Sequence, residues 1–427
     1  MSIQKLTHAV VPRRGYERYR CVLAVLTLAA WADSHHVVRT LAGAASASVS
    51  AQTTDHRHAA TSSRPAAQIT RTYYIAADVV DWDYAPTGTN QIAGRPFNDE
   101  EKRTTQVGPT VIGRQVRKAL YREYTDDTFK TLKPRPAEWE HLGIFGPIIR
   151  AQVGDTLRVV FRNNTKFPAS MHPHNVLYDK SSEGALYNDG TAGADKVDDG
   201  VPTGGTYTYI WRVPERAGPS EHEGSSTISM YHSHTDEVRD VASGLFGPMI
   251  ITKRGMAKPD GTPTDVDREI VAGFLEIDEA NSWFLEENIQ LHAKEPSQIK
   301  VRSGAFFNTI AAPDWDSYFR ETINGFSYGH TPGLTMRVGE RVRWYLMSGT
   351  DAEFHTPHWH GNVVNVDHMR TDMVSLMAMG MTVADMVPDN PGKWLFHCHV
   401  SIHMKAGMQA FYVVEPAIRG VTRSSGF

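Results

Sequence analysis

One pattern occurs twice along this 427-residue chain, and this repetition constrains the fold more than any other feature. Val153-Gly154-Asp155 and Val338-Gly339-Glu340 each precede an apolar run that is followed by a His-x-His pair. Another such pair closes each half of the chain. The four pairs are His172/His174, His232/His234, His358/His360 and His397/His399. Because an internal repeat indicates a repeated structural unit, we expect two similar domains.

The residue pattern within each repeat is that of β-structure. Short runs of β-branched and aromatic residues alternate with turn residues, and no long helical periodicity occurs. The stretch 255–265 is rich in Pro and Gly and is typical of a linker. We therefore predict an all-β chain with two β-sandwich domains, at residues 70–254 and 266–416.

The two ends of the chain do not show this pattern. Arg13 and Arg14 precede an apolar run too short to span a bilayer, which predicts an export signal over residues 1–32. Residues 33–69 are predicted to be disordered or a linker, and 417–427 to be a tail. The net charge of −4 gives no reason to expect a nucleic-acid partner. We expect an exported protein, periplasmic or extracellular, without membrane insertion.

Cys398 is the one cysteine outside the predicted signal, so it has no intrachain disulfide partner. Cys398, His403 and Met408 supply three of the four ligands of a trigonal copper site with a weak axial Met. In a β-strand, side chains alternate between faces, so His397 and His399 would face away from Cys398. The segment therefore has the residues to bind two metal centres connected by a few covalent bonds.

The four His-x-His pairs provide eight imidazoles. A single pair is weak evidence for a metal site, but two pairs per domain at matching positions are much stronger evidence. Imidazole suits copper, and a zinc enzyme has little use for the neighbouring thiolate and thioether. The sequence therefore favours a cluster of copper ions beside the Cys398 site.

These motifs are similar to the four copper-binding signatures of multicopper oxidases. The motifs are His172-Pro173-His174, His232-Ser233-His234, His355-Thr356-Pro357-His358-Trp359-His360-Gly361 and His397–Met408. Other stretches resemble the ceruloplasmin branch, including Gly244-Leu245-Phe246-Gly247-Pro248. Two domains make the chain similar to small laccases. The resemblance implies that both sandwiches are cupredoxin-like Greek-key domains.

The resemblance also implies which residues bind each of four copper ions per chain. The type 1 copper would be held by His355, Cys398, His403 and Met408, and the type 2 copper by His172 and His358. The type 3 pair would be held by His174, His232, His234, His360, His397 and His399. Ser233 stands where the first domain would need a Cys, so that domain is expected to lack a type 1 site.

The implied activity is laccase-like. A phenol or amine would lose electrons at the type 1 copper, and dioxygen would be reduced to water at the three other ions. Because this reduction needs protons, a nearby carboxylate is expected. We expect Glu183 to relay protons and Tyr178 to buffer electrons. The alternatives without a catalytic role are that Glu183 is a solvated acid in a loop and that Tyr178 is a tyrosine packed in a strand.

Two alternatives stay open at this stage. One is a metallo-oxidase acting on Cu(I) or Fe(II), for which the methionine-rich run 373–386 offers thioethers. Ferroxidase activity is not favoured, because Ile402 stands where the ceruloplasmin-like iron site has an acid. Another is a non-catalytic copper electron carrier, which would not need eight paired histidines. The resemblance further implies a homotrimer, with each cluster shared between neighbouring subunits.

Overall fold

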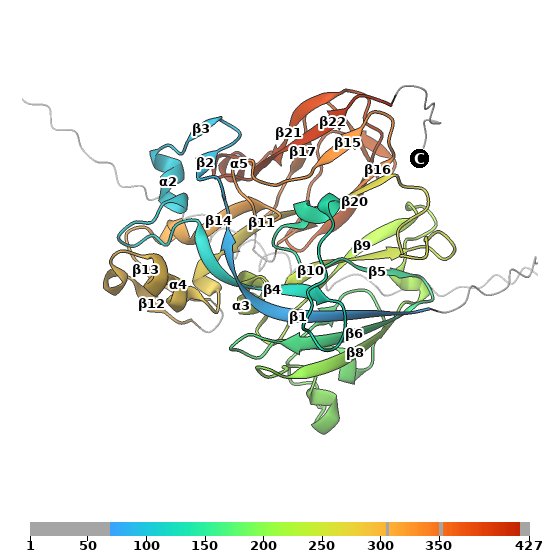
Figure 1. The fold of residues 1–427 in the computed structure, drawn as a ribbon, viewed down its shortest axis with the longest axis horizontal. Coiled ribbons are helices and arrows are strands. Elements are labelled where there is room, and N and C mark those ends of the chain that lie inside the picture. The colour runs from blue at the N-terminus through green and yellow to red at the C-terminus, as the bar shows by residue number, and fades with distance from the viewer. Residues whose placement is uncertain (1–68, 305–306, 350–352, 419–427) are drawn as a thin grey trace, which may run out of the picture. The chain divides into compact units, whose positions relative to one another are not determined.

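The computed structural model describes residues 69–304, 307–349 and 353–418, and its elements are labelled in Figure 1. The predicted export signal, nearly all of the predicted segment 33–69 and most of the predicted tail lie outside the described residues. The described chain is mostly strands with a few short helices, which confirms the all-β prediction.

The first sandwich has two four-stranded sheets. One runs in the order β4-β1-β6-β8 and the other in the order β5-β10-β9-β7. The strands of the first sheet are β1 (Thr70–Asp83), β4 (Gln115–Tyr124), β6 (Thr156–Asn163) and β8 (Thr206–Arg212). Those of the second sheet are β5 (Ile149–Gln152), β7 (His172–Pro173), β9 (Ser226–His232) and β10 (Phe246–Thr252).

The second sandwich has a six-stranded sheet and a four-stranded sheet, in the orders β14-β11-β16-β20-β18-β19 and β15-β22-β21-β17. The six strands are β11 (Arg268–Asp278), β14 (Phe319–Ile323), β16 (Val342–Ser348), β18 (Val364–Val366), β19 (Met369–Thr371) and β20 (Met381–Met386). The four strands are β15 (Thr335–Arg337), β17 (Pro357–Trp359), β21 (Gly392–Cys398) and β22 (Gln409–Glu415).

The two sandwiches repeat the same topology. The parallel pair β1–β6 corresponds to β11–β16, and the parallel pair β5–β10 corresponds to β15–β22. In each sandwich a short strand carrying one His-x-His pair lies antiparallel to the strand that ends in the other pair. This pairing sets His172 opposite His232, and His358 opposite His397. Residues far apart in sequence are thereby brought together at one edge of each sheet.

Short helices and hairpins connect the strands. The α-helices are α2 (Asp99–Thr105), α3 (Glu237–Ser243), α4 (Leu285–His292) and α5 (Ser401–Lys405). One hairpin pairs β2 (Thr89–Asn90) with β3 (Arg95–Pro96). The other pairs β12 (Lys300–Arg302) with β13 (Thr309–Ala311). Helix α3 begins where the Asp236 side chain accepts from the Arg239 N–H and ends at Gly244 in the left-handed conformation. Helix α3 follows His234 directly, and α5 contains His403.

Apolar side chains fill each sandwich and also pack between the two. Phe246 and Ile250 of β10 belong to the same buried cluster as Val271 of β11 and Tyr345 of β16. A bidentate ion pair reinforces this contact, since the Arg150 guanidinium lies 2.9–3.0 Å from both carboxylate oxygens of Glu269. This packing fixes the two sandwiches against each other.

Candidate metal centres

The Cys398 group consists of His355, Cys398, His403 and Met408, all nearly inaccessible to solvent. The Cys398 Sγ lies 3.9 Å from His355 Nδ1 and 3.7 Å from His403 Nδ1. Bonds of about 2.0–2.3 Å from a central metal, spread at about 120°, would place nitrogen and sulfur about 3.7 Å apart. The donor set and its spacing therefore fit a trigonal copper.

The chain reaches this geometry through a tight return after β21. The Cys398 N–H donates to the Met408 carbonyl at 3.1 Å, and the Met408 N–H donates to the His403 carbonyl at 3.0 Å. Gly407 sits in this turn at φ +122°, where a Cβ would lie only 2.9 Å from the Ser327 Cβ. Only glycine fits there without strain. The turn holds Met408 beside Cys398 inside the apolar core of the second sandwich.

Burial disfavours the charged forms of the histidines and the cysteine in the Cys398 group. Burial lowers the pKa of His355 to about 3, and it also lowers the pKa of His403. Burial raises the pKa of the Cys398 thiol, while the Thr356 N–H donates to Sγ at 3.4 Å and opposes that rise. Both imidazoles are neutral at pH 7, so their lone pairs are available to a metal.

The first histidine group comprises His172, His174, His232 and His234 at the ends of β7 and β9. The facing Nε2 atoms of His174 and His232 are 3.0 Å apart, and all four rings lie close together. Burial lowers the pKa of His174 to about 4 and that of His232 to about 3. Because neutral imidazoles converge here and each can offer a lone pair once the shared proton is released, the group fits a metal ion.

The second histidine group comprises His358, His360, His397 and His399 at the ends of β17 and β21. The His397 Nε2 lies 3.1 Å from both His358 Nδ1 and His360 Nε2, and the His399 ring packs against His358 and His397. Cys398 belongs to a different group from its neighbours, which confirms the predicted alternation along β21. One peptide bond thus separates a ligand of each group.

The two histidine groups stay distinct. Among the described residues, every potential metal-binding triad takes all its members from one sandwich. The eight paired histidines are therefore gathered as two sets of four, not as one set of eight.

Ser233 occupies the place in the first sandwich that Cys398 occupies in the second. Its hydroxyl donates to Asp240 Oδ2 at 2.6 Å and accepts from the Ser170 N–H at 3.0 Å. Asp240 is fully buried and also accepts from Trp283 Nε1 at 2.8 Å. We call Ser170, Ser233, Asp240 and Trp283 the Ser233 network.

The two residues predicted to assist dioxygen reduction lie beside the first histidine group. The Glu183 main-chain carbonyl accepts from His172 Nδ1 at 2.6 Å, but the Glu183 carboxylate turns to Lys180 and Tyr187. The Tyr178 ring lies 5.8 Å from the His172 ring. The geometry shows Glu183 orienting a histidine through its backbone, and the proton-relay and electron-buffer roles stay predictions.

The sequence prediction missed an acid pair, Glu276 and Glu321, beside His403. One carboxylate oxygen from each lies within 4.8 Å of a His403 ring nitrogen and of the other. The two residues are directly paired between β11 and β14. No sequence motif marks them, because β11 carries three acids without a recognisable spacing and β14 carries one.

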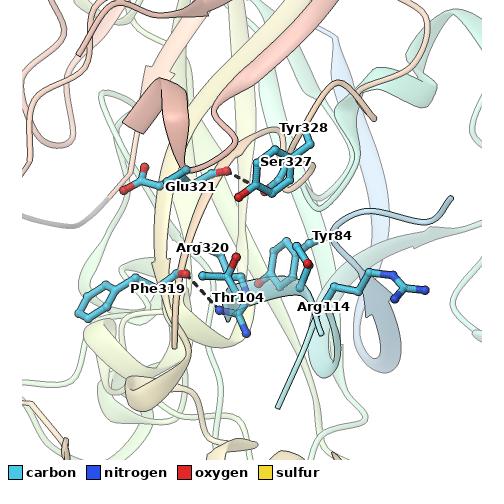
Figure 2. Close-up of a pocket in the computed structure, with 10 residues that line it drawn as sticks. Tyr84, Thr104, Arg114, Phe319, Arg320, Glu321, Ser327 and Tyr328 are labelled. Carbon is cyan, nitrogen blue, oxygen red and sulfur yellow. Dashed lines mark hydrogen bonds between the residues drawn. The ribbon is translucent and has the colours of Figure 1, made fainter. Parts of the chain in front are cut away.

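A small cavity lies behind Glu321, lined by Tyr84, Arg320, Ser327 and Tyr328 among others (Figure 2). Its volume is about 20 Å³, which is room for roughly one water molecule. Figure 2 shows the Glu321 carboxylate directed away from Tyr84 and Tyr328, while its carbonyl accepts from the Ser327 hydroxyl at 2.7 Å. The cavity is too small for a phenol.

The methionine-rich run divides into packed and exposed parts. Met379 and Met381 pack against buried residues, and Met386 is buried in the core. Met377 is 72% exposed. Packing therefore accounts for part of the run, as expected of methionine in a core.

The comparison with known families identifies the family to which the chain belongs. Sequence profiles of the multicopper oxidases match residues 142–255 and 290–417. The chain belongs to the multicopper oxidases. The two profile matches cover both sets of His-x-His pairs.

Individual relatives extend this result. The chain is 40% identical to human Ferroxidase HEPHL1 over 351 residues, which is 81% of this chain and 29% of that protein. It is 37% identical to mouse Hephaestin over 350 residues (81% and 29%) and 36% identical to human Ceruloplasmin over 354 residues (83% and 32%). The chain thus spans about a third of the length of these relatives.

Solved structures show the same fold at lower identity. The copper nitrite reductase from Nitrosomonas europaea superimposes with a TM-score of 0.50 at 15% identity, covering 81% of this chain and 94% of that one. At this identity the likeness concerns the fold alone. No helix in the described part of the chain is long and apolar enough to cross a membrane.

Proposed function

We propose that this multicopper oxidase takes electrons from a reduced metal ion, with Fe(II) as the leading substrate, and passes them to dioxygen. The observation that carries the proposal is the acid pair beside His403. Carboxylates bind Fe(II), and this pair lies beside the ring proposed to hold the type 1 copper, which would receive the electron. The relatives HEPHL1, Hephaestin and Ceruloplasmin support it, since the first is named a ferroxidase.

The proposal assigns four copper ions per chain to the three groups. His355, Cys398, His403 and Met408 would hold the type 1 ion, His172 and His358 the type 2 ion, and the other six paired histidines the type 3 ions. When bound, these ions supply one-electron uptake from the reductant and four-electron reduction of dioxygen to water. The chain's own part is to hold neutral donor atoms in converging positions and to join Cys398 to His397 and His399 through the backbone.

The acid pair has the position of an entry site for a cation. Glu276 and Glu321 are held by the β11–β14 pairing, and the charge of Glu353 acts on both Glu276 and His403. A cation held by the pair would lie within a few ångströms of the His403 ring. The neighbour Ile402 is exposed and supplies no carboxylate. Acids from other strands take the place that the sequence prediction looked for at 402.

Laccase-like oxidation of phenols or amines is the second candidate. Phe354 and Ile402, which flank His355 and His403 in sequence, are each more than half exposed and offer apolar surface to a ring. The cavity behind Glu321 does not admit one. The acid pair favours the metal ion, because apolar contacts alone need no buried carboxylates.

The separation of the two histidine groups supports the proposed homotrimer. Each chain offers a complete set of eight paired histidines, but it holds them as two separate sets of four. A head-to-tail ring of identical copies would bring the first set of one chain to the second set of the next. An exported location is part of the proposal and rests on the sequence of residues 1–32.

The test compares two reductants on one protein. We expect Glu276→Gln with Glu321→Gln to lower kcat/KM for Fe(II) by about 100-fold while phenol oxidation and the blue absorption stay within about twofold. Glu286→Gln on exposed α4 is the matched control. Equal losses for Fe(II) and phenol would contradict the entry site, and a copper-loaded wild type that consumes no dioxygen with Fe(II), Cu(I) or a phenol would refute the oxidase assignment.

A further inference from the structure

The histidines of the two groups differ in the acceptor that lies next to the ring nitrogen facing away from the group. Backbone carbonyls hold it in three cases: Glu183 for His172, Ser233 for His232 and Cys398 for His397, at 2.6, 3.0 and 2.8 Å. Two of the histidines have a carboxylate near the ring instead. His234 Nε2 lies 3.5 Å from Glu237 Oε2, a residue of the following helix α3. For His358, Nδ1 faces His397 at 3.1 Å, while Nε2 lies 3.4 Å from the carboxylate of Asp372, which comes from a separate loop.

The backbone around Asp372 is anchored independently of that carboxylate. The Trp359 N–H donates to the Asp372 carbonyl at 2.9 Å, and the Val374 N–H donates to the Pro357 carbonyl at 2.9 Å. Both bonds join the Asp372 segment to β17, which carries His358. The backbone of Asp372 is therefore fixed beside His358, and its carboxylate, which is 58% exposed, lies at the outer edge of that ring.

We propose that Asp372 is a positioning residue for copper: it accepts the Nε2 proton of His358 and so leaves the Nδ1 lone pair directed into the second histidine group. An imidazole that donates from one nitrogen has its other nitrogen fixed as an acceptor. A carboxylate acceptor also makes that ring a stronger metal ligand than a carbonyl acceptor does. The inference rests on the proposed copper assignment and adds to it the residue that sets the tautomer of one ligand.

Removing the Asp372 carboxylate should weaken copper binding in the second histidine group and leave the Cys398 group unaffected. Loss of the Asp372 carboxylate frees the His358 ring to rotate or to carry its proton on Nδ1, which removes one donor from the second group. The Cys398 group shares no contact with Asp372 among those described and keeps its copper. Acceptors of this kind contribute about 10- to 100-fold to metal affinity.

The test is a chelator titration of the copper-loaded full-length protein, with total copper and blue absorption measured on the same samples. We expect Asp372→Ala to release the copper outside the blue centre at a 10- to 100-fold lower free chelator concentration than wild type. Asp372→Asn should lose less, because its amide oxygen still accepts a hydrogen bond. The blue absorption should follow the wild-type curve in both variants.

The control is Asp367→Asn, the same chemical change at an exposed position on the preceding turn. Identical release curves for Asp372→Ala and wild type would overturn the proposal. So would parallel loss of blue and non-blue copper, because it indicates general unfolding. If wild type itself binds no copper beyond the blue centre, the assignment of the histidine groups fails instead, and the two failures are thereby distinguished.

Discussion

The two sandwiches have the same topology, yet the space around Cys398 and the space around Ser233 are used in opposite ways. Around Cys398, two imidazole nitrogens converge within 3.7–3.9 Å of Sγ, and the Thr356 N–H also donates to that sulfur. Around Ser233, the hydroxyl and the Asp240 carboxylate satisfy the neighbouring N–H groups directly. Counted from the matched His-x-His pairs, Ala169 and Val238 replace His355 and His403.

The difference shows what the fold requires and what the chemistry requires. The fold needs the end of β9 and the end of β21 to be stabilised, because each carries the second His-x-His pair. A hydrogen-bond network achieves this in the first sandwich, and a metal would achieve it in the second. The same architecture therefore holds a histidine group in both sandwiches but a group with a cysteine, two further histidines and a methionine in one.

The largest expected effect comes from making Cys398 resemble Ser233. Cys398→Ser removes the thiolate of the Cys398 group, so the blue absorption should disappear and turnover with any reductant should fall to background. The buried hydroxyl without an acceptor should cost about 1–3 kcal/mol of stability. Visible spectra and oxygen uptake measure this, and copper in the histidine groups is the internal control. Residual blue colour would contradict the Cys398 assignment.

A smaller effect concerns the pH dependence of the Ser233 network. Burial raises the pKa of Asp240 to about 6, above the value near 3.9 of an unfolded Asp. The folded protein therefore binds this proton more tightly, and the resulting stabilisation is present below about pH 4 and lost as the pH rises through about 6. Relative to Asp240→Asn, the unfolding free energy of the copper-free wild type should fall across this range by roughly 2–3 kcal/mol.

Urea denaturation at a series of pH values measures this slope. Asp195→Asn, an exposed acid of the same sandwich, should run parallel to wild type. Curves for wild type and Asp240→Asn that stay parallel throughout would show that Asp240 does not take up a proton in this range.

The smallest effect is expected from the reverse exchange. Ser233→Cys adds a thiol to the first sandwich but no histidines, because Ala169 and Val238 remain. Copper titration should give no second blue centre and no change in the amount of blue absorption per chain. A second copper–thiolate band would show that the Ser233 network yields to copper more readily than its hydrogen bonds indicate.

The sequence determined the fold class and the groups of donor residues. Alternation along a strand separates Cys398 from His397 and His399, and this local rule needs no tertiary information. The repeated motifs likewise identified which histidines would gather, because antiparallel pairing of two short strands is a local consequence of the same architecture.

Only the tertiary structure decided what surrounds these donors. Glu276 and Glu321 meet because β11 pairs with β14, and Asp372 reaches His358 because a loop returns along β17. Neither contact has a sequence signal, since an isolated carboxylate on a strand or loop has the same pattern whether it faces water or a metal site. The separation of the two histidine groups was also decided by packing, because spacing along a chain does not fix the distance between two domains.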